Sequence, residues 1–252
     1  MIKSKKLTKI KILKHGFFNS LGGKSTDIYK SLNCGPGSKD KISNIKKNLE
    51  IARRKFSKKA MNIFLVHQVH SNKFIYINER YNKKVKPKVD AIITNQRHLP
   101  IAILTADCAP ILICDDKKKM IAAIHAGWKG AYKGIVERVV KFMLKKGCQI
   151  EDMTAVIGPS ISSKNYEVKE DFKKKFIKKD KKNLKYFKIS GKKLYFNLIK
   201  YVQSCLQNNK IKSIDTIKID TFDIKNNFFS ARRALRLKHN DYGRNISIIM
   251  LN

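Results

Sequence analysis

Acidic residues are scarce in this 252-residue chain, where 19 Asp and Glu face 56 Lys and Arg and the formal net charge is +37. A surplus of this size first suggests a nucleic-acid partner, because basic side chains release the counterions condensed on phosphates. Arginine, which reads guanine edges and phosphates in bidentate fashion, is scarce too and contributes only nine of the 56. The lysines are spread from Lys3 to Lys238 without a separable tail. We therefore interpret the charge as solvated surface and predict no specific nucleic-acid partner.

The chain also lacks a long apolar run. Its longest apolar window, residues 99–114, contains Asp107 and two prolines, and residues 1–13 alternate charged and apolar side chains where a secretory signal has an unbroken apolar core. Cysteine occurs five times, an odd number that argues against a disulfide framework. These features predict no membrane partner and a reducing, cytoplasmic location.

What the chain does contain is enough apolar material for a core, 42% of its residues, in alternating helical and strand patterns. Apolar residues spaced by three or four predict helices over 38–56 (with Ser38 and Asp40 as possible caps), 131–146, 168–178 and 198–207. Short apolar runs predict buried strands at 91–94, 101–105, 111–114, 120–125, 154–157, 217–220 and 246–251. Interleaved strands and helices indicate a layered α/β architecture, and the absence of a linker predicts one domain over 1–252.

Chemically active side chains lie at the ends of the predicted central strands. Cys108 follows the apolar run 101–105, His125 closes the run 120–125, and His67 and His70 lie in a VHQVH segment. Two histidines and a cysteine suit a tetrahedral zinc site whose fourth position stays open for water. A Cys108 thiolate with His125 or His70 as its base is the alternative, and an inert buried cysteine is the third interpretation. The spacing alone leaves all three open.

Two further segments are candidate anion sites. Residues 127–130 lie between a predicted strand and a predicted helix, so their backbone N–H groups, together with Lys129, could bind phosphate; an ordinary turn is the alternative. Arg232 and Arg233 stand together after an apolar pair, and their recurrence in a chain poor in arginine favours ligand binding over surface charge.

Taken together, the motifs resemble those of the laccase-domain proteins, also called the multicopper polyphenol oxidase family and now regarded as purine nucleoside phosphorylases. The matching stretches occur in the expected order over nearly the whole chain: HGFF at 15–18, GGKS at 22–25, SLNCG at 31–35, QVH at 68–70, VDA at 89–91, TADCAP at 105–110, HAGWKG at 125–130, GPSI at 158–161, YEV at 166–168, FFSARR at 228–233 and YGR at 242–244.

The resemblance implies a single-domain sandwich of α/β/β/α layers with mixed sheets and a metal site made by His70, Cys108 and His125. The metal is usually assigned as zinc, and an older family label, copper-dependent polyphenol oxidation, also makes copper a candidate. The implied reactions are phosphorolysis of adenosine, inosine, guanosine and methylthioadenosine to free base and (methylthio)ribose 1-phosphate, and deamination of adenosine to inosine. Purine nucleosides and phosphate are then the expected small-molecule partners.

Roles for individual residues follow from the resemblance and the candidate sites together. We expect Cys108, His125 and Asp107 to be catalytic, and Lys129, Arg232 and Gly127 to bind substrate. Only six histidines occur, and the chain offers a single compact set of His and Cys, which favours zinc over a multinuclear copper centre. A metal-free thiol hydrolase or amidase that uses Cys108 and His125 is the competing hypothesis.

The chain departs from the family pattern at three positions. Ser20 lies near a position where the family commonly has Arg, Lys129 replaces the Arg of a Gly-Trp-Arg-Gly motif, and Asn197 replaces the Asp of a Phe-Asp-Leu motif. Lys129 keeps the charge but loses the planar fork of arginine. The metal trio is intact.

Overall fold

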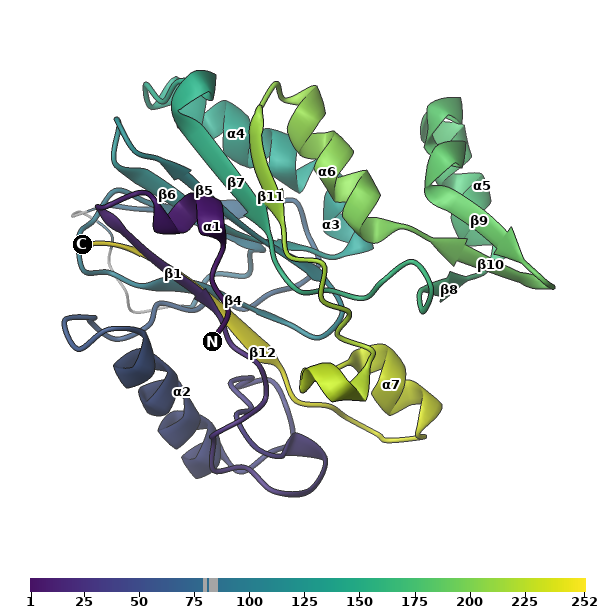
Figure 1. Ribbon diagram of the computed structural model, residues 1–252, viewed down its shortest axis with the longest axis horizontal. Helices are drawn as coiled ribbons and strands as arrows, with labels where there is room; N and C mark the ends of the chain where they lie inside the picture. Colours follow the sequence, from purple (N-terminus) through teal and green to yellow (C-terminus); the bar gives the residue numbers. More distant parts are fainter. Residues whose placement is uncertain (79–80, 82–85) are drawn as a thin grey trace.

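A computed structural model describes residues 1–78, 81 and 86–252, which form stacked α, β, β and α layers, the predicted architecture (Figure 1). The small sheet is antiparallel and consists, in order, of β1 (Leu13–Phe17), β12 (Asn245–Leu251) and β4 (Ile101–Thr105). The large sheet is mixed and consists, in order, of β11 (Ser213–Thr216), β7 (Met153–Ile157), β5 (Ala109–Asp115), β6 (Met120–Ala126), β3 (Ala91–Thr94) and β2 (Phe74–Ile77).

Helices cover the outer face of each sheet. The small sheet is covered by α2 (Ile42–Phe56), and the large sheet by α3 (Trp128–Tyr132), α4 (Ile135–Lys145) and α6 (Leu198–Asn208) (Figure 1). At one end of the molecule, α5 (Glu170–Lys179) packs with a further sheet of order β8 (Glu167–Val168), β10 (Lys193–Phe196) and β9 (Phe187–Ser190). The short helices α1 (Lys5–Thr8) and α7 (Ala231–Arg236) and the 3-10 turns η1 (Asp27–Tyr29), η2 (Ile150–Asp152), η3 (Lys181–Tyr186) and η4 (Ile224–Asn226) complete the described elements.

The strand period of two accounts for the layers. In β12, Ile246, Ile248 and Met250 pack against α2, whereas Ile249 and Leu251 face the large sheet. Central strands β5 and β6 are buried on both faces: Ile111 belongs to the core under the helices, and Leu112 to the core between the sheets. Burial on both sides explains why these strands were predictable as uninterrupted apolar runs.

Several predicted boundaries were wrong, with identifiable causes. Helix α2 begins at Ile42, because Asp40, proposed as a cap, instead accepts hydrogen bonds from Ser25 and Asn33. The helix predicted over 131–146 is divided into α3 and α4, since Gly134 has a left-handed φ of 83°. The strand predicted at 217–220 lies at Ser213–Thr216 instead.

The helix predicted at 168–178 is α5, which begins at Glu170 because the two residues of β8 precede it. The sheet formed by β8, β10 and β9 was not predicted at all. Residues Lys188, Ile189 and Ser190 of β9 are exposed, so this strand carries no apolar run that the sequence could show.

No helix among the described residues combines the length and the apolar character that crossing a bilayer requires. All five cysteines of the chain are described, and all are free thiols. The odd cysteine number therefore led to the correct expectation that no disulfide framework is present.

The N-terminal segment is joined to the sheets through a buried histidine of β1. The backbone N–H of Ser4 donates to Nε2 of His15 over 2.8 Å, and the Ser4 hydroxyl donates to Asp215 of β11 over 2.5 Å. His15 is 2% exposed, and burial together with the charge of Lys3 lowers its pKa to about 4. The ring therefore accepts the Ser4 bond in its neutral form.

We predict that His15 makes the free energy of unfolding strongly pH-dependent. Its pKa is lower in the folded than in the unfolded state, so its contribution is complete above the ordinary histidine pKa, roughly 6.5, and is lost as the pH falls towards 4. The lost contribution is on the order of 3 kcal/mol. Urea unfolding of the wild type and of His15→Gln between pH 7.5 and 4 should show a shallower dependence in the variant. Parallel curves would contradict the prediction.

Candidate metal centre and adjoining cleft

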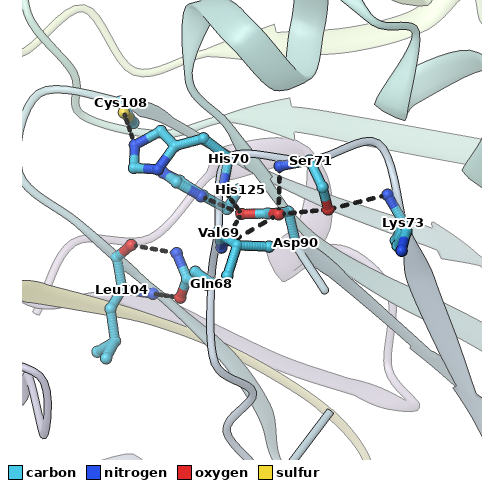
Figure 2. A network of polar contacts seen from close by, with 9 residues as sticks. All are labelled: Gln68, Val69, His70, Ser71, Lys73, Asp90, Leu104, Cys108 and His125. Atoms are coloured by element: carbon cyan, nitrogen blue, oxygen red, sulfur yellow. Dashed lines mark hydrogen bonds and ion pairs between the residues drawn. The ribbon is translucent and has the colours of Figure 1, made fainter. Parts of the chain in front are cut away.

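His70, Cys108 and His125 come together at one end of the central strands, as the sequence predicted. His70 lies in the loop before β2, Cys108 between β4 and β5, and His125 in β6, where it pairs with Pro110 of β5. One ligand atom from each lies within 4.8 Å of the others, and Cys108 Sγ is 3.9 Å from His70 Nε2 (Figure 2). Within the described part of the chain, no other three His, Cys, Asp or Glu residues form such a group.

The orientation of His125 is set by a buried carboxylate. His125 Nδ1 lies 2.8 Å from Oδ1 of Asp90, whose side chain is 0% exposed (Figure 2). An ionised carboxylate only accepts hydrogen bonds, so the imidazole proton is on Nδ1. Nε2 is therefore the nitrogen left to bind a metal, an arrangement typical of histidine ligands supported by a carboxylate.

Asp90 also shapes the loop that carries His70. Its carboxylate accepts the backbone N–H of His70 over 2.9 Å, the backbone N–H of Ser71 over 2.5 Å and the Ser71 hydroxyl over 2.7 Å. Burial alone would raise the pKa of Asp90, but the hydrogen bonds from His125 and Ser71 outweigh it and lower the pKa to about 2. His70 adopts a left-handed φ of 56°, a conformation that costs free energy and that these bonds stabilise.

Asp90 is not among the site residues predicted from the sequence, although it stands in the VDA motif directly before the apolar run 91–94. A carboxylate beside a buried strand was the available signal, because burying it requires several hydrogen-bond donors. Gln68 is a second supporting residue that was missed. Its side-chain amide donates to the carbonyl of Leu104 over 2.7 Å and accepts the Leu104 N–H over 2.8 Å, which joins the His70 loop to β4.

Gly127 leaves the space in which the trio meets. A Cβ atom at this position would lie 2.8 Å from Cys108 Sγ, 3.0 Å from His70 Cδ2 and 3.7 Å from His125 Nε2. Gly127 therefore lies against all three side chains, although its predicted role was substrate binding. Two imidazoles and one thiolate are a borderline-soft donor set that suits zinc, and tetrahedral zinc places ligand atoms roughly 3.5 Å apart. The residues present therefore fit a metal ion.

Cys108 and His125 change each other's protonation. Burial acts to raise the pKa of Cys108, but the charge and hydrogen bond of His125, with smaller effects of His70, lower it to about 6. Burial acts to lower the pKa of His125, but Cys108 and Asp90 raise it to about 9. The lowered pKa favours the thiolate form of Cys108, the form that binds metal, and metal binding would displace the extra proton of His125.

Asp107, predicted to be catalytic, is a buried residue next to Cys108 that also lines the apolar cavity described below. It has a left-handed φ of 83°, and its carboxylate accepts hydrogen bonds from the hydroxyls of Thr221 and Ser230 and from the backbone N–H of Arg232. Burial raises its pKa, and these bonds act against that shift. Asp107 thereby joins the loop of Cys108 to the start of α7.

The predicted cationic residues are in different environments. Lys129 is exposed, with its ammonium 5.7 Å from the ring centre of Trp128, and does not line either cavity beside Cys108. Arg232 does line one of them and donates to the carbonyl of Glu167 over 2.7 Å. Arg233 donates to the carbonyls of Thr221, Phe222 and Phe228 and so stabilises the backbone.

Two cavities meet at Cys108, and both also contact Ala106 and Tyr242. The one we call the polar cavity has about 420 Å³ and is lined by His70, Cys108, His125, Gln68, Lys86 and Arg244, among others. The one we call the apolar cavity has about 320 Å³ and is lined mainly by Ile161, Tyr166, Leu198, Ala231, Leu235 and Arg232. A larger depression of about 630 Å³, lined by residues such as Lys6 and Asp116, contains none of the trio.

Comparison with known proteins gives consistent matches over most of the chain. The family model described as multi-copper polyphenol oxidoreductase laccase matches residues 14–252. Proteins named purine nucleoside phosphorylase are similar to it: one from Bacteroides thetaiotaomicron is 32% identical over 92% of this chain and 88% of that protein, and one from Haemophilus influenzae is 34% identical over 90% of each. A crystal structure of a Neisseria meningitidis protein has a TM-score of 0.84 at 26% identity, covering 96% of this chain and 95% of that one.

We predict that Gly127→Ala strongly weakens metal binding by the trio. The added methyl group must displace the Cys108 sulfur or the His70 ring, so zinc affinity should fall by at least the roughly 10–100-fold that loss of a supporting residue costs. Competition with a chromogenic chelator measures this. Gly37→Ala is the matched control, since nothing lies within 4 Å of its added atom. Equal zinc affinity of the two variants would contradict the role of Gly127.

We predict that Asp90→Asn weakens zinc binding roughly 10–100-fold while the fold is retained. The neutral amide keeps the size of the side chain but removes the charge that fixes the His125 proton on Nδ1. Glu151→Gln, which removes an exposed carboxylate in η2, controls for the lost charge. Circular dichroism checks folding, and wild-type affinity in a folded Asp90→Asn variant would exclude the orienting role.

Proposed function

Because the chain belongs to the multi-copper polyphenol oxidoreductase laccase family, we propose that it is a zinc-dependent purine nucleoside phosphorylase. The observation that carries the proposal is the junction at Cys108, where a His-Cys-His trio lines a polar cavity and its cysteine also lines an apolar one. An anion and a flat, largely apolar base need such different surroundings. The names of the relatives supply the substrate class.

In the proposed reaction, a phosphate oxygen forms a bond to C1′ of the ribose as the C1′–N9 bond breaks. The electron pair of that bond goes to the purine, which leaves after protonation, and ribose 1-phosphate is formed. Adenosine, inosine, guanosine and methylthioadenosine are the proposed substrates, the last giving methylthioribose 1-phosphate. We propose in addition that adenosine is deaminated here: the oxygen of water replaces the amino group at C6, and ammonia leaves.

The residues of the chain provide binding, orientation and exclusion of water. His70, Cys108 and His125 would hold zinc, which when bound supplies a Lewis acid to the cleft. The apolar cavity would surround the nucleoside with Ile161 and Tyr166, and the Arg232 guanidinium lies 5.3 Å from the centre of the Tyr166 ring. Two imidazoles and a thiolate favour zinc, and the copper of the older family label remains the alternative metal.

A metal-free thiol hydrolase or amidase is the second candidate, and the Cys108 and His125 pair favours it. A cysteine whose pKa is lowered to about 6 beside an imidazolium is an activated nucleophile. The two functions differ in their response to chelation, because only a metal enzyme loses its activity. For either function, the free thiols support a reducing cytoplasm as the working location.

We expect zinc-loaded protein incubated with adenosine and phosphate to form adenine and ribose 1-phosphate, with inosine as the product of deamination. Removing zinc or phosphate should stop adenine formation. Cys108→Ala should lower kcat/KM by more than the roughly 10–100-fold that loss of a supporting residue costs, because it removes a metal ligand itself. Chromatography of the products, repeated with inosine, guanosine and methylthioadenosine, measures all of these effects.

The matched control for this experiment is Cys205→Ala in α6, which removes a thiol that is not part of the trio. It should retain wild-type activity. Absence of every phosphorolysis product from the zinc-loaded wild type would refute the proposed function. Full activity after chelation, with loss of activity on alkylation of Cys108, would instead establish the thiol enzyme.

A further inference from the structure

The wall of the polar cavity contains two cationic side chains that the sequence did not predict there. Among its described lining residues there is no Asp or Glu, whereas Lys86 and Arg244 both contribute to the wall. Lys129, Arg232 and Gly127 were the expected substrate-binding residues, and none of them lines this cavity. A concave surface with cationic side chains and without carboxylates selects an anion.

Arg244 has a defined position in this wall. A Cβ atom at Gly35 would lie 2.4 Å from Arg244 Cδ, so the glycine makes the space through which the side chain runs. The Arg244 backbone N–H donates to the side chain of Asn33 over 2.9 Å, and Nη1 donates to the carbonyl of Tyr242 over 2.9 Å. The guanidinium also lies 4.8 Å from the Tyr242 ring centre. Arg244 is thus oriented before a ligand arrives.

The charge of Arg244 is only weakly neutralised by the protein. Its acidic neighbour, Asp241, accepts short hydrogen bonds from the Tyr29 hydroxyl, 2.8 Å, and the Lys39 backbone N–H, 2.7 Å. Arg244 Nη2 is 3.5 Å from the other carboxylate oxygen, and the Arg244 side chain is 22% exposed. Since a guanidinium carries five N–H donors, some of them remain for a ligand.

We propose that Arg244 binds the phosphate co-substrate in the polar cavity, with Lys86 adding charge. This inference rests on the proposed function and names the phosphate-binding residue of the same site. The planar guanidinium of arginine can donate hydrogen bonds to two phosphate oxygens at once, whereas the ammonium of lysine cannot make this paired contact. The apolar cavity then takes the nucleoside, and the two substrates meet beside Cys108 and Tyr242, which line both cavities. Lys129, which replaces an arginine of the family motif, has no part in this binding.

The test is isothermal titration of the zinc-loaded, full-length protein with inorganic phosphate at physiological salt. Arg244→Gln should weaken phosphate binding roughly 10–100-fold, as expected for the loss of charge-assisted hydrogen bonds, and Arg244→Lys should restore only part of the affinity. Lys129→Gln tests the rival residue, and Arg97→Gln removes the same charge as Arg244→Gln from an exposed position. Both should bind phosphate as the wild type does.

Two further measurements keep the outcome interpretable. Lys86→Gln changes the same cavity without touching the contacts of Arg244 and should also weaken phosphate binding, so a misfolded Arg244→Gln protein does not end the test. Titration with adenosine 5′-monophosphate distinguishes free phosphate from the phosphate group of a nucleotide. Inorganic phosphate should displace adenosine 5′-monophosphate only if both ligands bind in the polar cavity. If only the nucleotide binds, and its affinity depends on Arg244, the proposal is overturned.

Failure of this inference is distinguishable from failure of the proposed function. If phosphorolysis occurs and Arg244→Gln leaves the KM for phosphate unchanged, the function stands and the role of Arg244 is refuted. If no nucleoside is cleaved but phosphate binding still depends on Arg244, the anion site stands and the phosphorylase proposal is refuted. If Arg97→Gln and Arg244→Gln weaken phosphate binding equally, the loss of affinity comes from the change in net charge alone, and the inference is overturned.

Discussion

Asp90 places one buried negative charge between two segments that are distant in the sequence, the loop of His70 and strand β6 with His125. A carboxylate without exposure must be fully hydrogen-bonded, because an unpaired buried charge costs several kcal/mol. The donors that meet this requirement are the N–H groups and the hydroxyl at the turn of the His70 loop, together with the imidazole of His125. A single desolvated charge therefore orients two of the three candidate ligands, and the geometry of the trio follows from it.

Charge is distributed across the centre in an ordered way. Asp90 and Asp107 are both buried, and each accepts hydrogen bonds from donors of the protein itself, although Asp107 also reaches the wall of the apolar cavity. In front of the ligands, the polar cavity carries Lys86 and Arg244 and, among its described lining, no carboxylate. Negative charge thus organises the framework and positive charge faces the cavity, an arrangement suited to an anionic substrate. Of the many cationic side chains of the chain, only those that line a cavity can contact a ligand there.

The predictability of the fold followed burial. Strands β5 and β6 lie between two layers and were visible as apolar runs. The trio as a set was indicated by the ordered family motifs. Strand β9 lies at the surface and gave no such signal. Helix boundaries failed where a tertiary contact competed with a local one: Asp40 hydrogen-bonds to Ser25 and Asn33 instead of capping α2. Local propensity cannot anticipate partners that reach a residue only in the folded chain.

The sequence by itself indicated the layered α/β architecture, and its ordered motifs, through the family resemblance, indicated the three residues of the His-Cys-His trio. The alternation of polar and apolar residues and the apolar runs indicate how each segment is buried. The ordered motifs indicate which side chains occur together in the family that the chain resembles. Only the tertiary structure decided that Asp90 supports the centre, that Lys129 lines neither cavity beside Cys108 and that Arg244 lines one of them. Those assignments depend on which side chains converge from segments separated by many residues, and on the direction each one faces, which packing alone sets.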